Sequence, residues 1–242
     1  MAMATRQRPR TLTARGYQQS VDAFGVGVGP AERVRASSVL DKVAGLTLLA
    51  IGAGAVGYVA NSPGLLIACL VLGAVSGMAA CWAPRTARYL AAPYAITEGV
   101  VLGAISHLYE SINGRIVPLA VLVTAAIYVT TLISYRSGLV RVTHRFYSMA
   151  LAATVGFLVV LVFGLFAGLP TFGPMAAVIG AVGILVGVMN LFIDFDFIYR
   201  AESSGMPKAA EWNMAVLVLV SLVLVYLNVL RFIAALSGGG RR

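Results

Sequence analysis

Charged residues are scarce in this chain, and acidic residues are the scarcest. Only 11% of the 242 residues are charged, and Asp and Glu together number 9, whereas a soluble domain averages about 25% charged residues. Hydrophobic residues make up 60% of the chain, and the mean hydropathy is +0.90. This composition excludes an ordinary soluble protein and indicates that most of the chain lies in a membrane.

Cysteine and histidine are also rare, with two residues of each. Cys69 and Cys81 are twelve residues apart in one apolar segment, about 18 Å along a helix, which is too far for a disulfide between them. Ser76 lies in a segment, GAVSG, that superficially resembles a serine nucleophile motif, but neither His107 nor His144 is placed to act as its base. We therefore expect no enzyme and no cofactor.

Seven apolar segments, each long enough to cross a bilayer, follow a basic N-terminal region. The predicted spans are 43–60, 64–83, 90–109, 116–134, 147–168, 174–198 and 214–236. Short connectors with turn residues separate them. We predict an all-α integral membrane protein with a seven-helix domain at 41–236. A basic, disordered cytoplasmic tail at 1–40 precedes it, and a short tail at 237–242 follows it.

The basic residues predict an orientation in the membrane. With the N-terminus in the cytoplasm, 14 of the 18 Lys and Arg residues lie on the cytoplasmic side and 4 on the other. The positive-inside rule accounts for this distribution, and for the net charge of +9, without a nucleic-acid partner. We expect a plasma-membrane protein, of a bacterium, whose main surroundings are the lipid bilayer.

The ionisable residues inside the spans are the functional candidates, because each acid costs about 2.5–3.5 kcal/mol at the centre of a membrane helix. Glu98 lies in the third span, and Asp194 and Asp196 lie near the cytoplasmic end of the sixth. Two residues correspond to about 200° of helical rotation, so the two aspartates cannot share a face. Asp196 is spaced to pair with Arg200, four residues later.

Each of these residues also has a purely structural interpretation. The two aspartates can be a solvated helix end, and Glu98 can make a packing hydrogen bond. Asn228, the polar residue of the last span, is of a type that commonly joins membrane helices through hydrogen bonds.

Several of these segments resemble those of the Bax-inhibitor/YccA-like family, the transmembrane BAX inhibitor motif proteins. The run NLFIDFDFI at 190–198, the connector with Pro207 and Glu211, and LNVLR at 227–231 carry the resemblance. EGVVLG at 98–103 is similar to the family's Glu-Gly segment, and YRSGLVRVT at 135–143 is similar to its actinobacterial branch. The resemblance covers roughly residues 40–236.

This resemblance implies a bundle with a central last helix and a pH-sensitive calcium leak. It also implies an acid pair between the sixth and seventh helices. Asp196 matches the sixth-helix acid, while the seventh-helix acid falls on Asn228, which cannot ionise. Asp194 and Glu98 are then the further acids available for this role.

General chemistry is compatible with such a leak. Calcium takes six to eight oxygen ligands, so a few carboxylates, here Asp194 and Asp196, bind it weakly and release it quickly. Neighbouring acids in a low dielectric resist joint ionisation, so that one retains a proton near neutral pH and can switch a contact. Arg85, Arg88 or Arg200 is a candidate latch for the ionised carboxylate.

Two other functions remain open at this point. The chain can be a non-transporting adaptor that binds or regulates a membrane protease or another membrane protein. It can also be a proton-coupled transporter, because membrane carboxylates serve as proton relays. A transporter would show stoichiometric substrate uptake, which a leak would not. The activity of an adaptor would be unchanged by charge-neutral replacement of Glu98 and Asp196.

Overall fold

Seven long α-helices make up nearly all of the described chain. The computed structural model describes residues 33–60, 62–82, 86–110, 113–167 and 173–238. Within these ranges, all seven helices are long and apolar enough to cross a membrane, which confirms the predicted all-α membrane fold. They are α2 (Ala36–Ala60), α3 (Pro63–Trp82), α4 (Ala87–Glu110), α5 (Ile116–Arg136), α6 (His144–Ala167), α7 (Pro174–Ser204) and α8 (Ala210–Gly238).

The helices extend beyond the apolar segments that predicted them, and two of them do so by six or seven residues at one end. The first span begins at Ala36 rather than at residue 43, so the last residues of the predicted 1–40 tail are helical; residues 1–32 lie outside the described residues. The sixth continues past residue 198 to Ser204 and ends where Gly205 adopts a left-handed conformation, with φ 72°. Gly205 donates its backbone N–H to Glu202 O, which closes the last turn. The helical structure thus continues through the polar residues that flank these two apolar segments.

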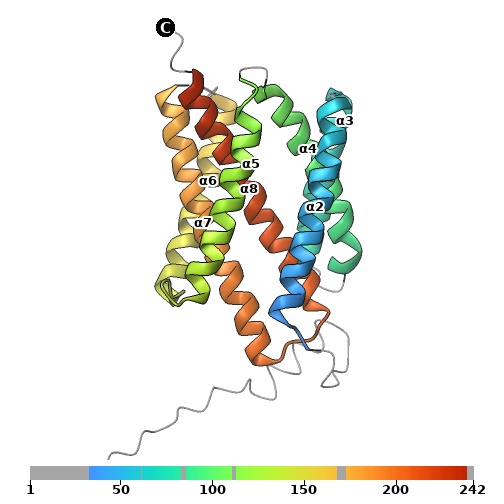
Figure 1. Cartoon of the computed structure of the whole chain (residues 1–242), viewed down its shortest axis with the longest axis vertical. Helices are drawn as coiled ribbons and strands as arrows, with labels where there is room; N and C mark the ends of the chain where they lie inside the picture. The colour runs from blue at the N-terminus through green and yellow to red at the C-terminus, as the bar shows by residue number, and fades with distance from the viewer. Residues whose placement is uncertain (1–32, 61, 83–85, 111–112, 168–172, 239–242) are drawn as a thin grey trace, which may run out of the picture.

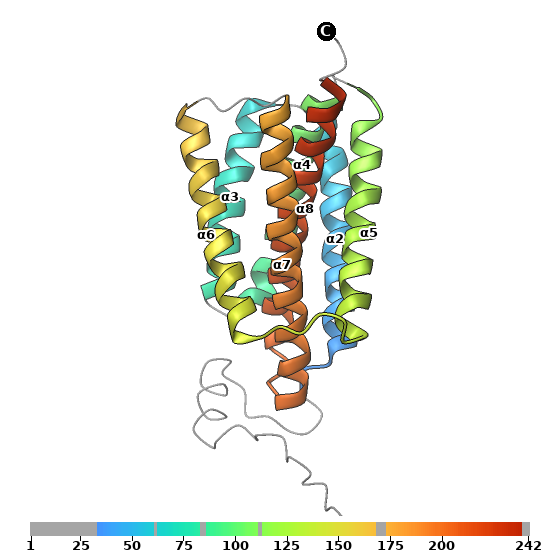
Figure 2. The ribbon, with the colours of Figure 1, turned by 90° about the vertical axis from the view of Figure 1, so that its left-hand side faces the viewer.

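The last helix, α8, runs through the middle of the bundle (Figures 1 and 2). It contacts α2, α3, α4, α5 and α7. Of its most apolar stretch, 56% is buried, against 11% for α6, which packs mainly on α7 at the periphery. This arrangement confirms the central last helix that the family resemblance implied.

Helices α2 and α4 approach each other through glycine. A Cβ added at Gly99 would overlap the backbone of Ala50, and one at Gly103 would overlap that of Gly54. Gly57 likewise lies directly against the backbone of Val100. Small residues allow this close contact, which is a common way for membrane helices to pack.

The two ends of the bundle differ in charge. We call the end formed by the start of α2 and the α3–α4, α5–α6 and α7–α8 connections the basic end; it lies at the bottom of Figure 1. The described basic residues of this end are Arg33, Arg35, Lys42, Arg88, Arg136, Arg141, Arg145, Arg200 and Lys208, whereas the opposite end has Arg115 and Arg231. Large apolar side chains such as Val59 and Phe163 are exposed on the sides, as lipid contact requires.

Candidate functional site

Asp194 and Asp196 lie in the last third of α7, toward the basic end. Asp194 is 20 residues after Pro174, about 30 Å along the helix. The two carboxylates point to different neighbours, as the 200° rotation between them predicts. Asp194 faces α8, and Asp196 faces α5.

Asp194 is joined to the central helix by a short hydrogen bond. The Ser221 hydroxyl of α8 donates to Asp194 Oδ2 at 2.5 Å. Ser221 is buried, and Asp194 is partly buried. Asp194 is therefore the acid of α7 that forms a hydrogen bond with α8.

Asp196 is held by two partners. Arg200 Nε lies 2.5 Å from Asp196 Oδ2, and the Tyr135 hydroxyl of α5 donates to Oδ1 at 3.0 Å. Arg200 also donates through Nη2 to the carbonyl of Val142 at 3.1 Å, which ties the α5–α6 connector to α7. Because the Asp196 side chain is 16% exposed and that of Arg200 is 67% exposed, the pair lies at the edge of the bundle. The predicted pairing of Asp196 with Arg200 is confirmed.

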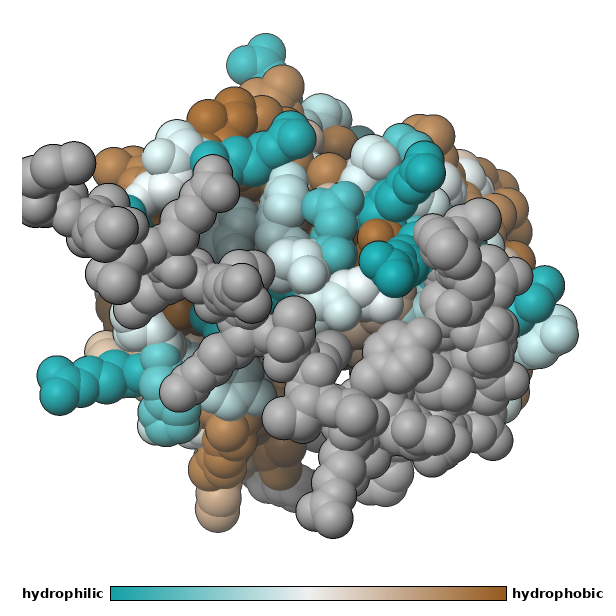
Figure 3. Space-filling view, turned by 90° about the horizontal axis from the view of Figure 1, so that it is seen from below, coloured by the Kyte–Doolittle hydropathy of each residue, from teal (hydrophilic) through white to brown (hydrophobic). Residues whose placement is uncertain are grey.

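An open pocket surrounds this ion pair at the basic end, with a volume of 480 Å³. We call it the arginine pocket. Its lining residues are Tyr135, Arg136, Gly138, Val140, Arg141, Val142, Asp196, Tyr199 and Arg200. Figure 3, which views the molecule from this end, shows hydrophilic residues gathered on the end face and apolar residues around its margin.

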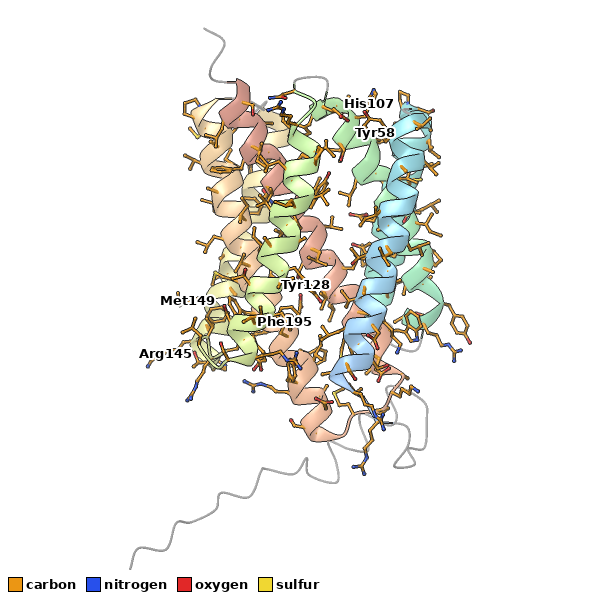
Figure 4. All side chains as sticks on the ribbon, viewed as in Figure 1. Tyr58, His107, Tyr128, Arg145, Met149 and Phe195 are labelled. Carbon is orange, nitrogen blue, oxygen red and sulfur yellow. The ribbon has the colours of Figure 1, made fainter. Side chains whose placement is uncertain are left out.

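Aromatic rings support the wall between α5 and α7. Tyr135 stacks on Tyr199 with ring centroids 5.4 Å apart, and Tyr128 packs on Phe195 at 5.7 Å. Figure 4 shows Tyr128 and Phe195 together between these two helices. Phe195 is fully buried, so the residue between the two aspartates anchors this part of α7 in the core.

Glu98 does not join the aspartates. It is partly buried on α4, and its Oε2 lies 3.1 Å from the position that a Cβ would take on Gly73 of α3. Glu98 has no hydrogen bond or ion pair with any residue that the structure describes. The structure therefore does not bring Glu98, which the sequence offered as a further acid for the pair, to Asp194 or Asp196, because their helices present these side chains to different neighbours.

The described residues offer no ready-made metal centre. Among them, no three His, Cys, Asp or Glu side chains are close enough to share an ion. Asp194 and Asp196 diverge from α7, so they do not form a two-carboxylate calcium site. A calcium ion at either one would need water for most of its oxygen ligands.

The comparison with protein families decides what kind of protein this is. A family model described as Bax inhibitor 1 like matches residues 4–238. The chain belongs to this family. None of the curated proteins compared with it matches.

In this Bax inhibitor 1 like protein, the partner expected for Asp196 lies elsewhere. Asn228 is buried and donates through Nδ2 to the carbonyl of Leu224 at 2.7 Å, and its side chain packs against Gly183 of α7. Gly183 precedes Asp196 by 13 residues, about 20 Å along the helix. The structure therefore does not bring Asn228 to Asp196, and α8 instead presents Ser221 to Asp194.

Of the three candidate latches, Arg200 contacts a carboxylate of α7. Arg88 is exposed at the start of α4, and its guanidinium lies 5.1 Å from the centroid of the Tyr89 ring. Arg85 lies outside the described residues. The described contacts thus support Arg200, on the same helix as Asp196, as the latch.

A second charged site, which the sequence did not reveal, joins α2 to α8. Glu211 is fully buried, and its Oε2 lies 2.6 Å from Lys42 Nζ. The backbone N–H of Arg35 and the hydroxyl of Ser38 also donate to this carboxylate, at 3.0 and 2.8 Å. The Lys42 ammonium lies 5.4 Å from the Trp212 ring. The spacing of Ser38 and Lys42, one turn apart, was a usable signal, but nothing local in the sequence indicates that Glu211 is their partner.

The segment before α2 is held at the same place. Glu202 accepts a hydrogen bond from the backbone N–H of Ala36 at 3.0 Å, and Val34 N–H donates to Met206 O at 2.9 Å. Two acids thus satisfy N–H groups at the start of α2, where the helix itself provides no acceptor. These contacts attach the start of α2 to the α7–α8 connection.

Proposed function

We propose that the protein is a pH-sensitive leak for cations, calcium among them, in the plasma membrane of a bacterium, with its basic end in the cytoplasm. The observation that carries the proposal is the environment of Asp196. Its carboxylate, on the wall of an open pocket at a membrane end, is neutralised by Arg200 and held by Tyr135. An acid held in this way can respond to a proton by releasing its partners.

The proposed gate is the contact between Asp196 and Arg200. When Asp196 is ionised, the ion pair and the Arg200 bond to Val142 hold α7 against the α5–α6 connector. Protonation of Asp196 removes the attraction to Arg200 and frees the connector to move. Low pH therefore favours the conducting state.

Asp194 is the proposed cation contact inside the bundle. It presents a carboxylate toward the central helix with only the Ser221 hydroxyl as a described partner. One carboxylate with waters binds calcium weakly, and weak binding is what permeation requires.

The experiment is a calcium flux assay. Purified protein is reconstituted into liposomes loaded with a calcium indicator, and influx is followed from pH 5.5 to 8. We expect influx to depend on pH in the native protein. We expect the Asp194→Asn/Asp196→Asn double variant to lose that dependence. Asp41→Asn, which removes an exposed acid of α2 at the same end, is the matched control and leaves the profile unchanged.

The outcomes separate the competing functions. An unchanged pH profile in the double variant rejects the gate. Influx that proceeds only with stoichiometric proton counterflow indicates a transporter. No influx above that of empty liposomes at any pH rejects the leak, and binding to a membrane protease or another membrane protein is then the function to test.

A further inference from the structure

The arginine pocket carries more positive charge than its own acid neutralises. Three arginines and one aspartate line it, which leaves a formal charge of +2. Arg200 is paired with Asp196. Arg136 and Arg141 form no ion pair with the residues that the structure describes, so two guanidinium groups share the pocket without an anion.

The local backbone brings these two arginines together. Arg136 ends α5, and the chain then turns through Gly138, whose φ of 72° favours glycine. The turn returns the chain so that Arg141 lines the same pocket as Arg136. Planar guanidinium groups suit oxyanions, because each can donate two parallel hydrogen bonds to phosphate oxygens.

An unused donor lies in the same wall. The Tyr199 hydroxyl is buried and has no hydrogen-bond partner among the described residues. Tyr199 lines the arginine pocket and stacks on Tyr135. A buried hydroxyl without a partner costs free energy, and an anion in the pocket offers it an acceptor.

The pocket also lies at the depth of lipid headgroups. Arg200 follows Pro174 by 26 residues, about 39 Å along α7, whereas the hydrocarbon core of a bilayer is about 30 Å thick. Arg136 ends a helix of 21 residues, about 30 Å long.

We propose that the arginine pocket binds a phosphate-bearing anion at the membrane surface, and this depth favours the headgroup of an anionic phospholipid over a soluble phosphate. The proposal does not depend on the leak function.

Direct binding tests this site. The purified protein in detergent is titrated with short-chain phosphatidylglycerol and, in separate arms, with short-chain phosphatidylcholine and inorganic phosphate; bound molecules are counted by native mass spectrometry. We expect phosphatidylglycerol to bind more tightly than phosphatidylcholine. Arg136→Gln/Arg141→Gln is expected to weaken phosphatidylglycerol binding by about tenfold or more. Asp196→Asn is expected to strengthen it, because it removes the only acid among the described residues that line the pocket.

Arg88→Gln/Arg145→Gln is the matched control. It removes the same charge from the same end, but neither residue lines the arginine pocket, and Figure 4 shows Arg145 pointing away from the bundle. We expect this variant to bind phosphatidylglycerol nearly as well as the native protein. Equal loss in the two double variants, or equal binding of the two lipids, overturns the proposal. Inorganic phosphate binding that the pocket variant abolishes, without phosphatidylglycerol binding, supports the phosphate site and assigns a soluble ligand to it.

Discussion

Lys42 and Glu211 join the first described helix to the last, with the ammonium 2.6 Å from a carboxylate oxygen. The two ends of this pair differ in their access to water. The Lys42 side chain is 18% exposed, whereas that of Glu211 is 1% exposed. Ser38 and the backbone of Arg35 complete the carboxylate's hydrogen bonds, so the pair fixes the start of α2 on the central helix.

This asymmetry predicts unequal effects on stability. Lys42→Met leaves Glu211 buried without its counter-ion and is expected to lower the free energy of unfolding by about 3 kcal/mol. Glu211→Gln leaves a lysine that can reach water, and about 1 kcal/mol is expected. Titration of the folded protein with a denaturing detergent measures the free energy of unfolding of both variants. The Lys42→Met/Glu211→Gln double variant is expected to lose less than the sum, and strict additivity would contradict the coupling.

The contact between α2 and α4 gives a second prediction. Gly103→Ala places a methyl group in the backbone of Gly54, which cannot move aside as a flexible side chain can. We expect a loss of about 1–3 kcal/mol in the free energy of unfolding. Gly52→Ala on α2 is the control, because a Cβ at Gly52 has no atom within 4 Å. This control is expected to be neutral or to stabilise by up to about 1 kcal/mol.

The hydrogen bond between Ser221 and Asp194 is open to the same kind of test. Ser221→Ala removes the donor to a carboxylate and is expected to cost about 1–3 kcal/mol in the same titration. Ser221→Thr retains the hydroxyl and is expected to recover most of that stability. Equal stabilities for the alanine and threonine variants would show that the hydroxyl contributes nothing to the α7–α8 contact.

The charge difference between the two ends predicts the orientation. Alkaline phosphatase needs an oxidising compartment for its disulfides, so its activity reports the side on which a fusion lies. Fused after Gly238, at the end of α8, the enzyme is expected to be active; inserted after Gly205, at the basic end, it is expected to be inactive. The reverse pattern would place the arginine pocket on the outer face.

Much of the fold follows from local properties of the sequence. The lengths of the apolar segments predict all seven spans, because a bilayer requires about 20 apolar residues from each. The Asp196–Arg200 pair is equally local, since residues four apart on a helix are neighbours. The helix ends are less predictable from hydropathy. α7 stays helical for six residues beyond residue 198, as far as Ser204, and ends at Gly205, whose left-handed backbone favours glycine.

The partners across helices depend on the tertiary structure. Asn228 and Ser221 are both polar residues of α8, and nothing in the sequence indicates which one faces an acid of α7. The axial register of the two helices places Asn228 against Gly183 and Ser221 against Asp194. The same holds for Lys42 and Glu211, which are 169 residues apart. The sequence by itself thus determined the membrane class, the seven spans and the contacts within one helix turn, because these depend on composition and helical periodicity. Only the packed bundle decided which buried polar groups meet, because that depends on helix register and on the rotation of each helix about its axis.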